Sequence, residues 1–377
     1  MKYQKVVEGR ESLKKLPQLM DKLSLRRPLI VGLEPLTGTL LRQHPGLLLC
    51  PVFSDFHPNP DLADAQAGAD AFRKGGCDGL LSIGGGSSID TAKAIKALLH
   101  AESLAAVREN RMPEKMETVH LAIPGTAGTG SEATQFAVAY AGEKKLSLNH
   151  PDLRPDGVLL DAALLDSLPI YHKKSCALDA LAQGIESYWC HAATEDSRVH
   201  AYLAILGVLD NLRAYLDGDR HAAEELLSAS YQSGKAIQQT RTTAAHAMSY
   251  MLTKTMGLAH GHACMVTLPA LWEMMQDRED MKPLLQDLAG KMRLGDCQLA
   301  PKLLRGILYD LEMTIPPMPD EEMLERLADS ANPERLGNHP VAMTREDVKA
   351  AYRRAFTPLC AAERQACLDI WRYYGRE

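Results

Sequence analysis

Residues 79–93 read Gly79-Leu-Leu-Ser-Ile-Gly-Gly-Gly-Ser-Ser-Ile-Asp-Thr-Ala-Lys93. An apolar run passes into three glycines and then into a stretch with helical periodicity, which predicts a strand, a tight turn and a helix. At such a turn, backbone N–H groups and the helix dipole can hold a pyrophosphate. Because the spacing is not G-x-G-x-x-G, the common dinucleotide fingerprint is absent. A tight turn that merely needs positive φ is the alternative interpretation.

A second loop of this kind, Pro124-Gly-Thr-Ala-Gly-Thr-Gly-Ser-Glu132, follows another apolar run. Around the two loops, apolar runs without period-2 alternation predict strands that are covered on both faces, over residues 28–32, 47–53, 79–83, 119–123 and 157–161. Helices are predicted over 61–74 and 88–100, and a hairpin over 136–140 and 146–149. This alternation indicates a parallel sheet, in which the two loops lie side by side.

The texture changes after about residue 170, where strand-like runs end. Helical segments rich in Ala, Leu, Met and Glu continue to the C-terminus, with breaks at Gly257, Pro269, Pro316-Pro317 and Pro340. A chain of 377 residues is too long for a single core. We therefore expect two domains, an α/β domain over 1–168 and an all-helical domain over 169–377.

Composition narrows the class of protein. A net charge of −6 without a stripe of Lys and Arg argues against nucleic-acid binding. No stretch approaches the ~20 apolar residues of a membrane span, and the first residues lack the apolar run of a signal peptide. The eight cysteines are scattered and never spaced as CxxC, which indicates reduced thiols. We expect a cytoplasmic protein with a small-molecule substrate and no nucleic-acid or membrane partner.

Two histidines in the helical half carry the strongest chemical signal. His246 and His260 lie among small and apolar residues, and Asp179 lies in a helical stretch of aliphatic residues. A carboxylate in such a setting is costly unless positive charge compensates it. One carboxylate and two neutral imidazoles can hold a divalent ion and leave a position open for water or substrate. An open position predicts catalysis.

Together these motifs resemble the iron-containing (group III) alcohol dehydrogenase family along nearly the whole chain. The family's GGGSxxDxxK loop matches Gly84 to Lys93, its TTxGTGSE loop matches Gly125 to Glu132, and its metal motifs match the Asp179 and His246/His260 segments. The resemblance implies a Rossmann-like nucleotide-binding domain followed by a helical metal-binding domain, the dehydroquinate synthase-like fold. Within the family, the chain is most similar to the phosphonoacetaldehyde reductases (hydroxyethylphosphonate dehydrogenases).

The resemblance also implies ligands. NAD or NADP would be lined by Asn59, Gly85, Gly86, Ser87, Asp90, Thr126, Thr129, Ser131, Val138 and Lys145. One divalent metal, Fe²⁺ or Zn²⁺, held by Asp179, His246 and His260, would polarise an aldehyde for hydride transfer. The family's acidic residue at the adenosine ribose corresponds to Leu33, with Glu34 adjacent, so the choice between NAD and NADP stays open. Relatives are often dimers, which predicts a homodimer.

Two positions depart from the family pattern. Gln183 stands four residues after Asp179, where many members have a histidine ligand, and an amide oxygen is a weaker ligand than imidazole. Gln183 is therefore either a distant fourth metal ligand or a hydrogen-bonding group behind the ligands. Tyr250 stands where a second histidine is common, so its hydroxyl is a candidate proton donor. His262 is the alternative relay, or else a structural histidine held by hydrogen bonds.

The main prediction is a metal-dependent, NAD(P)-linked alcohol dehydrogenase or aldehyde reductase. If it reduces phosphonoacetaldehyde to 2-hydroxyethylphosphonate, Arg241 is the candidate cation for the phosphonate, with Arg154 and Lys235 as alternatives. A glycerol dehydrogenase-like enzyme or a sugar-phosphate cyclase shares the architecture. A cyclase needs many cations near its metal, however, and residues 242–269 hold only Lys254. A degenerate, non-catalytic family member is the remaining alternative.

Overall fold

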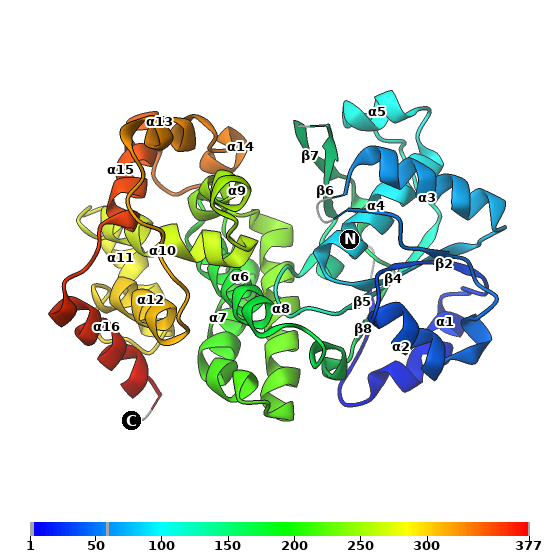
Figure 1. Ribbon diagram of the computed structural model, residues 1–377, viewed down its shortest axis with the longest axis horizontal. Coiled ribbons are helices and arrows are strands. Elements are labelled where there is room, and N and C mark those ends of the chain that lie inside the picture. Colours follow the sequence, from blue (N-terminus) through cyan, green and yellow to red (C-terminus); the bar gives the residue numbers. More distant parts are fainter. Residues whose placement is uncertain (1–3, 58–59, 143, 376–377) are drawn as a thin grey trace. The chain divides into compact units, whose positions relative to one another are not determined.

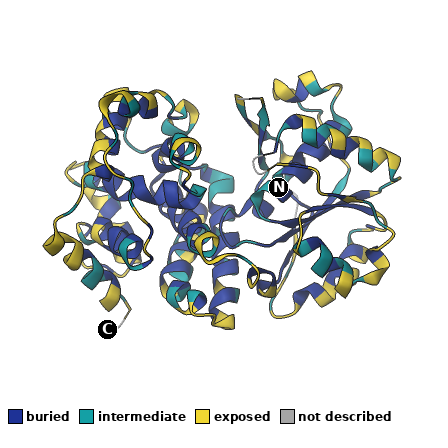
Figure 2. Ribbon diagram, viewed as in Figure 1, coloured by how far each residue is buried: buried dark blue, intermediate teal, exposed yellow. Residues whose placement is uncertain are grey.

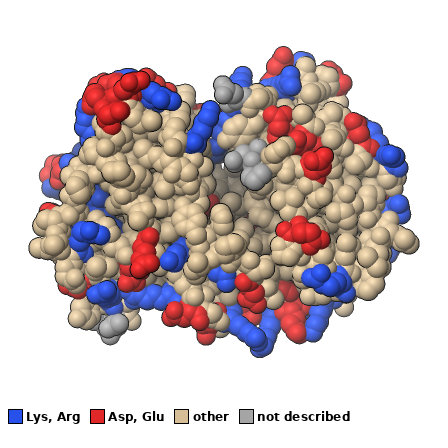
Figure 3. Space-filling view, viewed as in Figure 1, with Lys and Arg blue, Asp and Glu red and all other residues tan. Residues whose placement is uncertain are grey.

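The computed structural model describes residues 4–57, 60–142 and 144–375 (Figure 1). The chain divides into two compact units: the first runs to Pro169 and includes Asp217–Gly234, and the second consists of Ile170–Leu216 and the residues from Lys235 onward. Within the described ranges, no helix is long and apolar enough to cross a membrane. On the face drawn in Figure 3, basic side chains are interspersed with acidic ones and form no stripe.

The first unit is built on a six-stranded parallel sheet with the order β1-β8-β5-β4-β2-β3. Its strands are β1 (Lys5–Glu8), β2 (Pro28–Gly32), β3 (Val52–Phe53), β4 (Gly79–Gly84), β5 (Val119–Pro124) and β8 (Gly157–Leu160). An antiparallel hairpin, β6 (Phe136–Ala141) with β7 (Lys144–Asn149), forms a separate sheet. The helices of this unit are α1 (Leu16–Lys22), α2 (Leu36–Gln43), α3 (Leu62–Lys74), α4 (Gly86–His100) and α5 (Leu104–Arg108).

Both faces of the parallel sheet are covered, as the unalternating apolar runs predict. Leu29 and Val31 of β2 lie in one buried cluster with residues of α3 and α4. Ile30, between them, lies in a second cluster with residues of α1 and α2. Successive side chains of a strand point to opposite faces, so helices on both faces favour apolar residues along the whole strand (Figures 1 and 2).

Two features of the sheet correct the sequence-based prediction. Of the predicted strand 47–53, only Val52–Phe53 pairs, with β2. Pro45–Leu47 form a 3-10 helix, and Leu48 and Leu49 are 64% and 81% exposed. Strand β1 was not predicted, because its mostly exposed, partly charged residues are those of an edge strand rather than an apolar run.

Residues 217–234, the first part of α8 (Arg220–Thr240) and the turn before it, are grouped with the α/β unit. Tyr231 donates a hydrogen bond to Gln4, at 2.7 Å. Gly130 has φ +59°, and a Cβ atom on it would lie 2.5 Å from the Cα of Gly234. Nothing in the helical pattern of residues 217–234 predicts this packing. The predicted division therefore has a single boundary, after residue 168, and does not group residues 217–234 with the α/β domain.

The second unit is helical. Its remaining helices are α6 (Ile170–Trp189), α7 (Glu195–Leu216), α9 (Ala244–Met256), α10 (His260–Gln276), α11 (Lys282–Lys291), α12 (Leu299–Asp310), α13 (Glu321–Asp329), α14 (Pro333–Leu336), α15 (Arg345–Phe356) and α16 (Ala361–Tyr373). Helix α10 is buried along most of its length and packs against α6, α9, α12 and α15. The centre of this unit is therefore where α6, α9 and α10 meet.

Candidate metal centre and nucleotide-binding loops

A glycine determines how closely α10 approaches α6. A Cβ atom on Gly261 would lie 2.0 Å from the carbonyl oxygen of Ser175 and 2.7 Å from the backbone nitrogen of Asp179. Only a residue without a side chain permits this contact between the two backbones. Because His260 precedes Gly261, the close approach brings its imidazole beside the carboxylate of Asp179.

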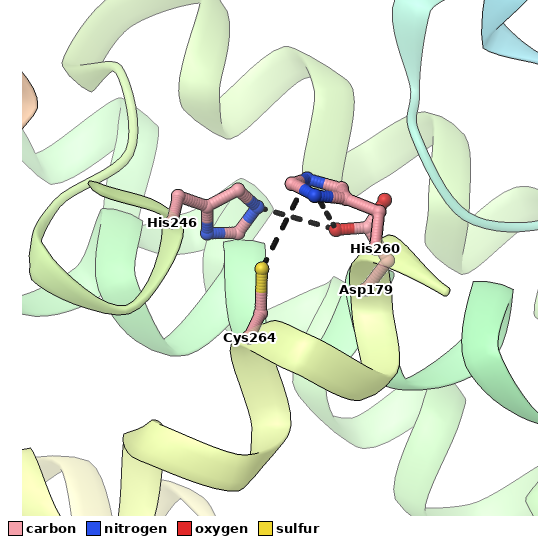
Figure 4. Close-up of side chains that lie close together, drawn as sticks. All are labelled: Asp179, His246, His260 and Cys264. Carbon is pink, nitrogen blue, oxygen red and sulfur yellow. Dashed lines mark hydrogen bonds and ion pairs between the residues drawn. The ribbon is translucent and has the colours of Figure 1, made fainter. Parts of the chain in front are cut away.

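Asp179, His246 and His260 converge on one point, together with Cys264 (Figure 4). The Asp179 carboxylate oxygen lies 3.2 Å from His246 Nε2 and 3.8 Å from His260 Nε2. The sulfur of Cys264 lies 3.9 Å from His260 Nε2. Ligands bonded at their usual lengths to one tetrahedral ion lie about 3.3–3.7 Å apart. The donor atoms and their spacing therefore fit a single divalent cation such as zinc or iron.

A buried carboxylate fixes the orientation of His246. One oxygen of Glu186 contacts His246 Nδ1, and the other accepts hydrogen bonds from the Thr243 hydroxyl at 2.6 Å and the Ala245 N–H at 2.8 Å. A histidine whose Nδ1 donates to a carboxylate presents the lone pair of Nε2 to a metal. The Glu186 side chain is fully buried, so this orientation is firmly held.

The acidic groups and the imidazoles of the cluster shift one another's pKa values. Burial alone would raise the pKa of the Asp179 carboxyl, but His260 and His246 lower it below its ordinary value. Burial likewise raises the pKa of the Cys264 thiol, yet the two imidazoles bring it down to about 7. Burial would lower the pKa of His246, but Cys264 and Glu186 raise it well above normal. Each shift favours the charged form of the group: the carboxylate of Asp179, the thiolate of Cys264 and the imidazolium of His246.

Gln183, Tyr250 and His262 surround the cluster in different ways. Gln183 hydrogen-bonds the Asp179 carboxyl, which supports a place behind the ligands. The ring of Tyr250 stacks on the His260 imidazole, with 6.2 Å between centroids and 7° between planes. His262 contacts the Tyr171 hydroxyl through Nδ1 at 3.1 Å and the Thr314 carbonyl through Nε2 at 3.0 Å. With both ring nitrogens engaged, the structural interpretation of His262 is favoured over the relay.

Two arginines lie near Tyr250 and the start of α9. Arg241 follows α8 with φ +66°, and burial lowers its pKa, with smaller contributions from Glu334 and Arg335. The Arg335 guanidinium lies over the ring of Tyr250, 5.6 Å from its centroid, and contacts the Thr242 hydroxyl. The side chains of Arg335, Tyr250 and His260 therefore stack one on another, and His260 belongs to the cluster with Asp179, His246 and Cys264.

In the first unit, β4 and β5 are neighbours, so the two glycine-rich loops meet at the carboxyl ends of adjacent strands. Gly85 precedes α4 and Gly86 opens it. Cβ atoms on these glycines would lie 3.2 Å from Thr126 and 3.0 Å from Thr129. The predicted pyrophosphate loop therefore begins a fifteen-residue helix and packs against the second loop.

Several residues that are predicted to line the nucleotide interact with one another. Asp90 accepts hydrogen bonds from the Ser131 hydroxyl at 2.5 Å and the Val138 N–H at 2.8 Å. Lys145, on β7, interacts electrostatically with Asp90. Ser87 lies in the first turn of α4, where its carbonyl accepts from Thr91 at 2.7 Å. The predicted contact Asn59 lies outside the described residues.

Glu34, the acidic residue beside the position expected to select between NAD and NADP, interacts with a residue near it in the sequence. Glu34 accepts a hydrogen bond from the N–H of Gly38 at 3.3 Å, in the first turn of α2. Leu33 is 39% exposed. The carboxylate that was expected to replace the family's ribose-binding acid is thus turned towards its own helix.

Three residues at these sites were not predicted. Cys264 follows His260 by four residues, a spacing that places both side chains on one face of a helix. Glu186 follows Asp179 by two helical turns, and this spacing was likewise available as a signal. Lys93 ends the first glycine-rich motif, but nothing in the sequence indicates that its ammonium group is buried.

Comparison with known proteins agrees with the motifs. Residues 4–162 match the family described as iron-containing alcohol dehydrogenase, and residues 174–356 match the C-terminal domain of the Fe-containing alcohol dehydrogenase family. A phosphonoacetaldehyde reductase of Streptomyces viridochromogenes is 36% identical over 230 residues, or 57% of this chain and 58% of that protein. A lactaldehyde reductase of Escherichia coli is 32% identical over 226 residues, or 58% of each chain. These alignments thus span little more than half of either relative.

The fold has a close counterpart among solved structures. A sulfoacetaldehyde reductase from Bifidobacterium kashiwanohense in complex with NAD⁺ superposes with a TM-score of 0.88 and 25% identity, over 95% of this chain and 98% of that one. With both family domains matched in order along residues 4–356, the chain belongs to the iron-containing alcohol dehydrogenase family.

Proposed function

We propose that this protein is a metal-dependent, NAD(P)-linked aldehyde reductase whose substrate is a short aldehyde that carries an anionic group. The convergence of Asp179, His246 and His260 on one point carries the proposal. In this assignment, Asp179, His246 and His260 would hold a divalent cation that would supply Lewis-acid polarisation of the carbonyl, and a bound reduced nicotinamide would supply the hydride. The protein's own residues bind the substrate, orient it and neutralise its anionic group.

The residues around the cluster have separate tasks. Glu186 holds the ring of His246 through Nδ1, and Gln183 holds the carboxylate of Asp179, so that two ligands are fixed before substrate arrives. The His260 side chain is 39% exposed, whereas those of Asp179 and His246 are 3% and 2% exposed. Substrate therefore reaches the cluster from the side of His260. The ring of Tyr250 stacks on the His260 imidazole, and its hydroxyl is the candidate proton donor.

An anionic group on the substrate is supported by the cations beside Tyr250. Arg335 lies over the Tyr250 ring, and Arg241 is near enough to Arg335 for their charges to interact. Arginine pairs with phosphonate or sulfonate oxygens through its planar, multiple donors. Two of the similar proteins are named for acetaldehydes that carry such groups. Phosphonoacetaldehyde is accordingly the first substrate to test.

The test is an aldehyde panel, assayed with NADH and with NADPH after reconstitution with Fe²⁺ or Zn²⁺. Phosphonoacetaldehyde and sulfoacetaldehyde should have a lower KM than propanal. Arg335→Gln and Arg241→Gln should raise KM for the two anions by about tenfold, the cost of one charged hydrogen bond, and leave propanal unchanged. Arg326→Gln, at an exposed position on α13, is the control. Equal effects on anionic and neutral aldehydes would remove both arginines from the substrate site, and no nicotinamide turnover with any aldehyde would overturn the proposal.

A further inference from the structure

The fourth member of the cluster is a cysteine, although the family pattern places a histidine ligand at a different position. On α6, the residue four positions after Asp179 is Gln183, which hydrogen-bonds Asp179. On α10, the residue four positions after His260 is Cys264, whose sulfur is 3.9 Å from His260 Nε2. Both pairs share a helix face. Helix α6 thus lacks the family's imidazole at position 183, and α10 instead carries a sulfur at position 264, four residues after its own proposed ligand.

We propose that the thiolate of Cys264 is a ligand of the metal, and that the fourth protein ligand has moved from α6 to α10 in this chain. The proposal rests on the assignment of Asp179, His246 and His260 as ligands in the proposed function. It adds to that function a statement of which residue completes the site and which metal the site prefers.

Position and burial of Cys264 support this assignment. Its sulfur is one of four ligand atoms that all lie within 4.8 Å of one another, and the residue is fully buried. Its side chain points towards the same centre as the two imidazoles (Figure 4). Another buried cysteine of this unit, Cys190, donates a hydrogen bond to the Thr240 carbonyl at 3.3 Å. The sulfur of Cys264 instead lies 3.9 Å from His260 Nε2, among three other side chains that can each offer a ligand atom to the same metal ion.

A thiolate ligand has consequences for metal choice and for coordination. Soft sulfur favours zinc over the harder divalent ions, so we infer that zinc is preferred to iron at this site. With Cys264, four protein side chains would hold the metal, and the substrate oxygen would bind in addition to them, as catalytic zinc sites allow. The exposed side of His260 is where a fifth ligand has access.

Cobalt(II) substitution tests whether Cys264 is a metal ligand without any measurement of activity. The wild-type protein loaded with Co²⁺ should show a sulfur-to-cobalt charge-transfer band in the near ultraviolet, and Cys264→Ser should lack it and bind Co²⁺ at least about tenfold more weakly. Cys190→Ser, at another buried cysteine of the same unit, should keep both the band and the affinity. In the zinc protein, X-ray absorption should find one sulfur at about 2.3 Å.

A compensating variant keeps the test sharp if Cys264→Ser folds poorly. Gln183→His combined with Cys264→Ala restores the family's arrangement and should recover most of the affinity lost in Cys264→Ala, without the charge-transfer band. Tight binding of Co²⁺ by the wild type with no sulfur band would overturn the cysteine ligand and leave the proposed function intact. Failure of the wild type to bind one metal per chain would overturn both.

Discussion

The two units each bury a polar cluster, and the two clusters are balanced in opposite ways. In the α/β unit, the ammonium group of Lys93 donates to the Ser131 carbonyl at 2.7 Å, the Ser131 hydroxyl at 2.9 Å, the Thr134 hydroxyl at 3.1 Å and the Phe136 carbonyl at 2.6 Å. In the helical unit, the possible ligand atoms of Asp179, His246, His260 and Cys264 all lie within 4.8 Å of one another. The first cluster is closed around the ammonium group of Lys93, whereas the second brings together four side chains that can ligate a metal.

The difference suggests separate roles: the first cluster stabilises the fold, and the second is the proposed ligand-binding site. A buried cation with several acceptors is a closed network, which fixes structure and leaves nothing to bind. By joining α4 to residues 131–136, Lys93 holds the second glycine-rich loop against the first. A convergent set of acceptors is costly to bury by itself. The proposed function places the metal at the helical cluster, and each of the following changes tests this contrast.

The largest effect is expected from His246→Ala. The change removes one proposed ligand and leaves the Glu186 carboxylate buried without its imidazole, so the variant should bind less than a tenth of the wild-type metal and lose more than about a hundredfold in activity. Metal content by mass spectrometry, with thermal melting to check folding, is the measurement. His191→Ala, at an exposed histidine of the same unit, should change neither. Full metal content in the His246 variant would contradict the assignment.

A smaller effect, on stability rather than chemistry, is expected from Lys93→Met. Loss of the ammonium group leaves buried acceptors without a donor and should lower the free energy of unfolding by about 3 kcal/mol. Denaturant unfolding measures this change, and Lys74→Met, at an exposed lysine on α3, should have little effect. Metal content should stay at the wild-type level. If Lys93→Met instead lost metal and kept its stability, the division of roles between the clusters would be wrong.

The smallest effect is a pH dependence at Glu132, which follows the glycine-rich loop. Burial raises the pKa of this carboxyl to about 7, against its own backbone N–H and Lys93, which lower it. The folded chain therefore binds this proton more tightly than the unfolded chain. The stability that the group contributes is fully present below pH 4.5 and is lost as the pH rises through about 7.

Glu132→Gln removes this titration. Relative to the wild type, the variant should gain stability between pH 5 and pH 8, by up to about 3 kcal/mol. Urea unfolding across this range is the measurement, and Glu225→Gln, at an exposed position of the same unit, serves as control. A constant difference between wild type and Glu132→Gln at every pH would show that the carboxyl is not protonated in the folded chain.

Sequence patterns predicted what depends on neighbours along the chain. The strand and helix that flank Gly84 to Gly86 and the hairpin follow local periodicity. The meeting of Asp179 with two histidines from other helices is a distant contact, and it was predicted from metal-ligand chemistry and the family motifs. What was missed depends on distant contacts. The charged edge strand β1 is defined only by its pairing with β8.

The same limit applies at the site. Cys264 had the right spacing from His260, but only the close packing of α6 and α10 around Gly261 brings its sulfur to the cluster. Likewise, the burial of Glu186 behind His246 depends on how α6 meets the start of α9. Spacing gives the face of a helix, and packing between helices decides what that face meets.

The central claim is that one divalent cation is held by Asp179, His246 and His260. The most direct measurement is an anomalous-scattering map of the crystallised protein, collected at the absorption edge of the metal with which it purifies. The account predicts a single strong peak per chain, about 2 Å from the Asp179 carboxylate oxygen and from Nε2 of both histidines. A peak at any other place in a fully active preparation, or activity with no peak, would contradict it.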